Sequence, residues 1–310
     1  MLSQIFAGRR LALVTLVFVT LSAGSYAESI RDWVARGDAY YNQQNYSEAF
    51  KWYQASANTG DPIAERHLGG LYADGYGVDQ NYEMAMYWYR SAADKGDAKA
   101  MRNIGLMYEG GEGRTVDYAQ AMLWYRKSAE AGLPRAFYEV GRMCFNGEGV
   151  RRDYHLVMKW YQIAAQKGVA DAMADIGYLY DSGQGVPQDY TKASEWYAKG
   201  ATHGSVAGMR NLGLMYVTGI GGPQHCATGR SWLDAAAKAG DIKADQWLKS
   251  HNEECVSRFD ARDDARASCL RRCWESFESY YQGFQRSQNP SLDGLLSAGH
   301  QRDECNLQCY

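Results

Sequence analysis

Residues 61–96 read DPIAERHLGGLYADGYGVDQNYEMAMYWYRSAADKG, and this stretch decides the fold because its pattern returns every 36 residues. The pair Trp88-Tyr89 recurs at residues 124–125, 160–161 and 196–197, and Trp232 continues the series. The loop pattern Gly75-x-Gly77 recurs at residues 111–113, 147–149, 183–185 and 219–221. A fixed period of this length is the sequence signature of a helical solenoid.

Each 36-residue unit is predicted to contain two antiparallel helices. Ala64, Leu68 and Leu71 recur at helical spacing and define the apolar face of a first helix. Gly75 is expected to end that helix, because glycine adopts the left-handed conformation that stops it. Asn81, which is Asp in the next three units, is a good N-cap for a second helix. Neither helix can bury its face alone, so we expect the units to stack.

Two features of the repeat predict how its helices pack. Gly69 lies in the middle of the first helix, where glycine costs about 1 kcal/mol relative to alanine. Because a glycine returns at this place in every unit, we expect a neighbouring helix to need the room. We also expect Trp88, Tyr89 and their equivalents to form the packing face of the second helix, with the tryptophans largely buried between repeats.

The recurring residues make the chain similar to the Sel1-like repeat (SLR) proteins, a family related to the tetratricopeptide repeats. The resemblance covers residues 29–252 and implies an all-α fold, a right-handed α-solenoid of stacked antiparallel helix pairs. A shorter unit is expected at 29–60, and one further first helix at 241–252. The positions shared with the family in the reference unit are Ala64, Leu68, Gly69, Tyr72, Gly75, Gly77, Val78, Ala85, Trp88, Tyr89, Ala92, Ala93 and Gly96.

The first 27 residues are predicted to be a secretory signal peptide, which makes the mature protein periplasmic or secreted. Arg9 and Arg10 precede an apolar run at residues 11–21, and Ser25 and Ala27 suit a cleavage site before Glu28. The uncharged stretch is short for a bilayer span, which needs about 20 apolar residues. An uncleaved membrane anchor is the alternative. The expected domains are the signal peptide 1–27, a repeat solenoid 28–252 and a cysteine-rich region 253–310.

The cysteine-rich region is predicted to be a helical hairpin held by disulfides. Cys269 and Cys273 are four residues apart, as are Cys305 and Cys309, so each pair lies on one face of a helix. Exported proteins form disulfides, and antiparallel helices favour Cys269–Cys309 with Cys273–Cys305. Four cysteines allow three pairings, so this choice depends on the hairpin geometry. Zinc binding by the four thiolates is the weaker alternative.

Three cysteines lie elsewhere and are assigned different roles. Cys226 starts a second helix, and Cys255 follows the antiparallel helix after it, so we predict that they form a third disulfide. Cys144 replaces the tyrosine that other units carry at the position of Tyr72. A buried thiol filling a core position is expected there, because free cysteine is commonly buried. An intermolecular disulfide is the alternative.

No motif for catalysis, metal binding or cofactor binding appears in the chain. There is no H-E-x-x-H pair, G-x-S-x-G elbow, P-loop or dinucleotide fingerprint, and the repeat itself explains the Gly-x-Gly pairs. The formal net charge is −3, and no block of basic residues is present. This charge pattern argues against nucleic acid or an anionic membrane as the main partner.

The exposed side of the first helices is the predicted binding surface, because that row lines the concave face of such solenoids. Arginine and tyrosine are over-represented among the residues that dominate protein interfaces. His67, Glu139, Asp175 and Asn211 are also expected to face this side. The residues assigned to partner binding are Arg66, Arg102, Asn103, Tyr138, Arg142, Tyr178 and Arg210.

The sequence therefore predicts a monomeric, non-enzymatic scaffold that binds a protein partner and needs no cofactor. The resemblance implies periplasmic relatives that act as regulators, assembly factors or immunity proteins against delivered toxins. An immunity role agrees with the signal peptide, the disulfides and the lack of catalytic motifs. The alternative is an enzyme, such as a thiol–disulfide exchanger in the cysteine-rich region. Its Cys-x-x-x-Cys spacing differs from the redox-active Cys-x-x-Cys, which disfavours that alternative.

Overall fold

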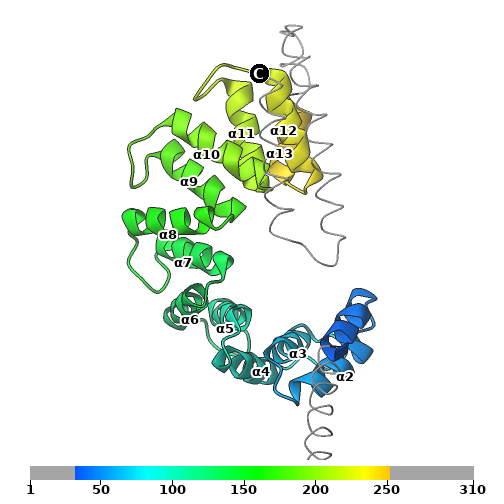
Figure 1. The fold of residues 1–310 in the computed structure, drawn as a ribbon. Coiled ribbons are helices and arrows are strands. Elements are labelled where there is room, and N and C mark those ends of the chain that lie inside the picture. The colour runs from blue at the N-terminus through cyan, green and yellow to red at the C-terminus, as the bar shows by residue number, and fades with distance from the viewer. Residues whose placement is uncertain (1–31, 252–310) are drawn as a thin grey trace, which may run out of the picture. The chain divides into compact units, whose positions relative to one another are not determined.

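The structure, a computed structural model, describes residues 32–251 (Figure 1). The described residues form two compact units, with the boundary between Trp160 and Tyr161. Residues 32–42 form a first helix, and no strand occurs in the described part. The helices that follow are α2 (Tyr46–Ala57), α3 (Pro62–Asp74), α4 (Tyr82–Asp94), α5 (Ala98–Gly110), α6 (Tyr118–Glu130), α7 (Pro134–Asn146), α8 (Tyr154–Gln166), α9 (Ala170–Ser182), α10 (Tyr190–Thr202), α11 (Val206–Thr218), α12 (Cys226–Lys238) and α13 (Ile242–Ser250).

Helices pair within each repeat and stack on the next repeat in the same unit. In the first unit, α3 packs on α4 and α5 packs on α6, while α2, α4 and α6 contact α3, α5 and α7 respectively. In the second unit, α9 pairs with α10, α11 pairs with α12, and α13 packs on α12. The predicted all-α solenoid of stacked helix pairs is confirmed, and α13 is the predicted extra first helix.

The helix boundaries lie where the sequence placed them. Asn81 accepts a hydrogen bond from the backbone N–H of Met84 at 3.0 Å and caps α4. Asp117 and Asp189 cap α6 and α10 in the same way. Gly75 follows α3 with φ of 72°, a left-handed conformation that favours glycine. The cap pattern explains why consecutive helices have nearly equal lengths.

The glycine in the middle of the first helix makes room for a tyrosine. A Cβ atom built on Gly69 would lie 2.7 Å from Cδ1 of Tyr89, a separation that real side chains do not adopt. A Cβ atom on Gly105 would be equally close to the ring of Tyr125, and one on Gly177 would be equally close to the ring of Tyr197 in α10. The expectation that a neighbouring helix occupies this space is confirmed.

The burial of the Trp-Tyr pairs differs from the expectation. Tyr125 is fully buried, but Trp124 is only partly buried, and the other pairs show the same division. Neighbouring residues of a helix point about 100° apart, so only one of the two can face the partner helix squarely. The tyrosine takes that place. The indole of Trp124 lies at the edge, where Lys127 Nζ stands 4.2 Å from its ring centroid.

Cys144 is completely buried in α7, and burial raises the pKa of its thiol. The prediction of a buried core thiol is confirmed. Cys226 is the first residue of α12. The predicted signal peptide at 1–27, the cysteine-rich region 253–310 and the other five cysteines lie outside the described residues, so their pairings remain predictions. Within residues 32–251, every helix is too short or too polar to span a bilayer.

Candidate protein-binding surface

Three of the buried tyrosines, Tyr53, Tyr125 and Tyr197, hydrogen-bond to carboxylates on the first helices. The hydroxyl of Tyr53 donates to Asp38 at 2.6 Å, and that of Tyr125 donates to Glu109 of α5 at 2.6 Å. Burial, followed by the neighbouring carboxylate, raises the pKa of both phenols well above its usual value. Each hydroxyl is therefore a permanent donor that links the second helix of a repeat to its first helix.

Two of the predicted binding residues, Arg66 and Arg210, are held by ion pairs between consecutive repeats. Arg66 Nε donates to Asp97 Oδ2 at 3.2 Å, and Arg210 Nη1 lies 2.5 Å from Asp241 Oδ2. In both cases the aspartate is the N-cap of the next first helix. One carboxylate thus caps a helix and anchors an arginine from the preceding repeat.

Arg102 is the equivalent of Arg66 one repeat later, but its partner differs. The N-cap of α7 is Leu133, which makes no side-chain hydrogen bond to the helix. Arg102 instead donates from Nη2 to Glu139 Oε1 at 2.8 Å, and its buried Nε has no hydrogen-bond partner among the described residues. Loss of the capping aspartate therefore redirects this arginine along the neighbouring helix.

Glu139 is the centre of an ionic network in the first unit. The expectation that Glu139 lies on the exposed side is wrong: this carboxylate is almost completely buried and accepts hydrogen bonds from Arg102, Arg135 and Arg142. Burial alone would raise the pKa of Glu139, but the arginines outweigh it and hold the pKa below its usual value. A buried carboxylate needs such partners, because an unpaired charge is costly in the interior.

Arg142 joins this network to the repeat before it. Its Nη2 donates to Glu109, and its Nε donates to Glu139 at 3.1 Å. Burial disfavours the charged guanidinium, yet the two carboxylates raise the pKa of Arg142 above its usual value. Because Glu109 also accepts from the Tyr125 hydroxyl, Arg142 is part of the packing as well as of the predicted surface.

The three remaining predicted residues differ in their contacts. Asn103 is half-buried and hydrogen-bonds to the Tyr89 hydroxyl. Tyr138 is half-buried, with the Arg135 guanidinium 4.5 Å from its ring centroid. Tyr178 in α9 is 41% exposed. Within the first unit the Glu139 network brings Arg102 and Arg142 together, while Tyr178 and Arg210 belong to the second unit.

The ion pairs themselves were not expected from the sequence. The sequence does contain a pattern that could have predicted two of these ion pairs, because Arg66 and Arg210 are each followed 31 residues later by the aspartate that they contact. Leu133 breaks that spacing for Arg102, so the contact with Glu139 has no comparable sequence signal. Among residues 32–251, no group of three or more His, Cys, Asp or Glu side chains could hold a metal ion.

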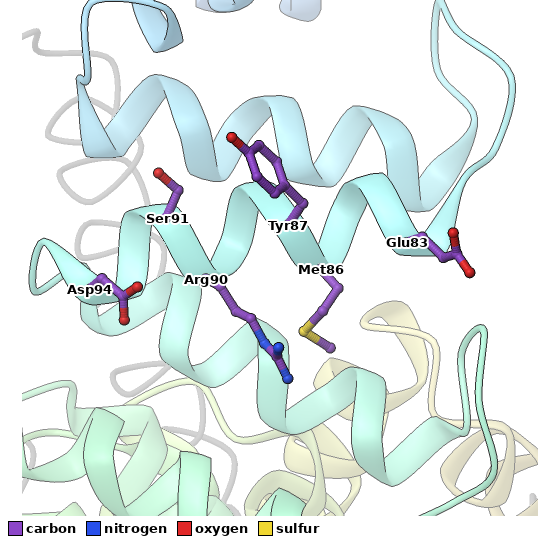
Figure 2. Close-up of a pocket in the computed structure, with 6 residues that line it drawn as sticks. All are labelled: Glu83, Met86, Tyr87, Arg90, Ser91 and Asp94. Atoms are coloured by element: carbon purple, nitrogen blue, oxygen red, sulfur yellow. The ribbon is translucent and has the colours of Figure 1, made fainter.

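An open depression of about 450 Å³ lies elsewhere, against the second helix α4. Figure 2 shows that the side chains lining it all come from that one helix, among them Met86, Tyr87 and Arg90. Arg90 Nη2 donates to the Tyr108 hydroxyl at 3.1 Å. None of the predicted binding residues lines this depression, so it is separate from the first-helix surface.

Comparison with known proteins identifies the repeats. Six consecutive Sel1 repeats match residues 36–61, 62–97, 98–133, 134–169, 170–205 and 206–241. A Sel1 repeat protein from Oxalobacter formigenes is 33% identical, with 74% of this chain and 91% of that protein aligned and a TM-score of 0.65. A protective antigen of uropathogenic Escherichia coli with an SLR fold is 29% identical, over 91% of this chain and 63% of that protein, with a TM-score of 0.65.

No curated protein matches the chain significantly. The Sel1 repeat is a scaffold fold, generally used for contacts between proteins. The matched repeats cover most of the chain, and their boundaries agree with the helix pairs of the structure. The chain therefore belongs to the Sel1 repeat family.

Proposed function

We propose that this protein is an exported, non-enzymatic scaffold that binds a protein partner through its first helices. The observation that carries the proposal is the division between a constant frame and a variable surface. Tyr53, Tyr125 and Tyr197 are all buried at the same place in their repeats. The first-helix position of Arg66 changes along the chain, by contrast, to Arg102, Tyr138 and Arg210, and in the fourth of these repeats it is a buried alanine, Ala174. A repeated core cannot distinguish partners, whereas a varied surface can.

Tyr138 and Tyr178 are the side chains best suited to direct contact. Tyrosine supplies a large, rigid area with a polar tip, and it is enriched among interface hot spots. Tyr178 is exposed, and Tyr138 stacks with Arg135 at the rim of the Glu139 network. The arginines are held in fixed geometry by their carboxylates, so they contribute a preorganised polar surface around the tyrosines.

The proposed location is the periplasm or the exterior of the cell, and the proposed state is a monomer. The support is the sequence of residues 1–27 and the six cysteines of the last third, which suit an oxidising compartment. Within that setting, an immunity role against a delivered toxin and an envelope regulatory role both agree with a scaffold that binds a protein and catalyses no reaction. A toxin gene beside the gene for this chain would support the immunity role.

Affinity capture from envelope extracts tests the proposal. Tyr138→Ala and Tyr178→Ala should each weaken capture of the partner by about thirtyfold, since truncating a hot-spot residue costs about 2 kcal/mol or more. Lys159→Ala, on the exposed side of the second helix α8, is the matched control and should bind as the wild type does. Normal binding by both tyrosine variants would remove the first helices as the partner site.

Thiol titration of the native, oxidised protein tests its non-enzymatic character. Structural disulfides and a buried Cys144 predict no fast-reacting thiol before unfolding. Rapid reaction of low-pKa thiols in the cysteine-rich region would favour a thiol–disulfide exchanger instead.

A further inference from the structure

The N-terminal turns of α3, α5 and α7 carry a row of basic side chains in the first unit. Residues 63, 99 and 135 occupy the same place in successive repeats and are Ile63, Lys99 and Arg135. One turn further on stand Arg66 and Arg102. The contacts of Arg66 with the N-cap of α5, and of Arg102 with Glu139 of α7, show that the N-terminal halves of these helices are neighbours.

The basic groups of this row reach solvent more than the acids that balance them. The side chains of Arg102 and Arg135 are 25% and 43% exposed, whereas that of their shared partner Glu139 is 5% exposed. Asp97 is 11% exposed and also accepts the backbone N–H of Ala100 at the start of α5. The charge presented to solvent is therefore positive, although the whole chain is acidic.

Lys99 is the clearest element of the row. Its side chain is exposed and makes no ion pair with any residue between 32 and 251. Its charge acts on the neighbouring repeat: burial first, then Arg66 and also Lys99, lower the pKa of His67 to about 4. Asp38 and Asp97 act on the same imidazole in the opposite direction, so the charge of Lys99 adds to that of Arg66 against these two carboxylates.

The opposite ends of the same helices are acidic. Asp74 ends α3 and Glu112 follows α5. Burial raises the pKa of both carboxyls, and the charge of Asp74 raises that of Glu112 further. The first-helix surface therefore carries basic side chains at the N-terminal turns of the helices and acidic side chains at their C-terminal ends. The helix dipoles add to that polarity, because their positive ends lie at the N-terminal edge.

We propose that this edge, formed by Lys99 with Arg66, Arg102 and Arg135, binds an acidic segment of the protein partner. The proposal rests on the proposed scaffold function and adds the chemistry of the partner. Charge complementarity of this kind increases the association rate and sets the orientation of the bound chain. Exposed Ile63 at the end of the row provides one apolar contact beside the charges.

The test uses the full-length protein and two fluorescein-labelled peptides of eight residues, one with four glutamates and one with four glutamines. Fluorescence anisotropy at low ionic strength should show saturable binding of the glutamate peptide only. Lys99→Glu should weaken it by about tenfold, because each surface charge contact is worth up to about 1 kcal/mol and the reversal adds repulsion. Binding should also weaken as salt is added.

Lys159→Glu is the control, since it changes the net charge equally on the second helix α8. The thermal midpoint of both variants shows that they remain folded. Equal binding of the two peptides, or equal weakening by Lys99→Glu and Lys159→Glu, would overturn the proposal. Capture of the natural partner by Lys99→Glu at wild-type affinity would also overturn the proposal. The scaffold function would remain supported in that case if Tyr138→Ala still weakens capture.

Discussion

Arg66 and Asp97 form an ion pair whose carboxylate also caps the next first helix of the solenoid. Asp97 Oδ2 accepts from Arg66 Nε at 3.2 Å, while its Oδ1 accepts the backbone N–H of Ala100 at 2.7 Å. One side chain therefore ties two repeats together and satisfies a helix terminus. Four repeats later the same arrangement joins Arg210 to Asp241.

Restoring this arrangement at Arg102 should stabilise the protein. Leu133→Asp places a carboxylate at the uncapped start of α7, 31 residues after Arg102. A good N-cap contributes about 1 kcal/mol, and the ion pair with Arg102 contributes up to about 1 kcal/mol more, so the free energy of unfolding should rise by more than about 1 kcal/mol in a urea titration. Val169→Asp is the control, because α9 is also uncapped but the residue 31 positions earlier is Tyr138. A gain no larger than that of the control would show that Arg102 stays with Glu139.

Removing the charge of Glu139 should destabilise the first unit. Glu139→Gln leaves Arg102, Arg135 and Arg142 without their shared carboxylate. Breaking a buried ion pair from one side typically costs about 3–5 kcal/mol, and the partial exposure of the arginines places this variant at the lower end. Chemical unfolding measures the loss. Glu130→Gln, exposed at the end of α6, should change stability by less than about 0.5 kcal/mol.

Truncation of the two residues of one Trp-Tyr pair should have unequal effects. Tyr125→Ala removes a fully buried ring and should cost about 3–5 kcal/mol, the usual range for a large core aromatic. Trp124→Ala removes a partly buried ring and should cost clearly less. Thermal unfolding of the two variants gives the comparison. A larger loss for Trp124→Ala would contradict the assignment of the tyrosine as the core residue.

The stability of the protein should fall in weak acid because of His67. Burial, with Arg66 beside the ring, lowers the pKa of His67 to about 4, below the value of about 6.5 expected in the unfolded chain. Protons then bind the unfolded state more readily, so the stabilisation is complete above pH 6.5 and declines towards pH 4.

The decline attributable to His67 is at most about 3 kcal/mol, since one pKa unit corresponds to about 1.36 kcal/mol. Melting curves at pH 7.5 and pH 5 should show a smaller loss for His67→Gln than for the wild type. His155→Gln, at an exposed position of α8, should behave like the wild type. Equal losses in all three proteins would show that His67 is not responsible.

The sequence predicted the frame of this protein well because the frame repeats. Gly69 and Asn81, or its aspartate equivalents, return with the same roles, so the helix limits, the caps and the need for room beside Gly69 followed from the period, whereas the structure identifies Tyr89 as the side chain that fills that room. The division of burial between Trp124 and Tyr125 did not follow, because the choice between adjacent aromatic residues depends on the orientation of the partner helix.

The ionic network was harder to predict than the frame. Long side chains such as Arg102 and Arg142 can reach several acceptors, and the choice among them depends on which carboxylates the packing buries. The residue at the position of Arg66 varies from unit to unit, and such variation is typical of a binding surface. The same variation is also found where the residue makes an internal ion pair, as Arg102 does with Glu139. The tyrosines of that surface therefore provide cleaner tests of partner binding than the arginines.

The ion pairs between repeats join residues about one period apart, and this has a consequence for how the number of repeats can change during evolution. Arg66 meets Asp97 after 31 residues, and Arg102 meets Glu139 after 37, so each ion pair spans about one period. A gene encoding such a chain can lose or duplicate one whole period and leave the remaining contacts between neighbours in register. The length of the binding surface can then change in steps of one helix pair, because each added repeat packs with the same core residues.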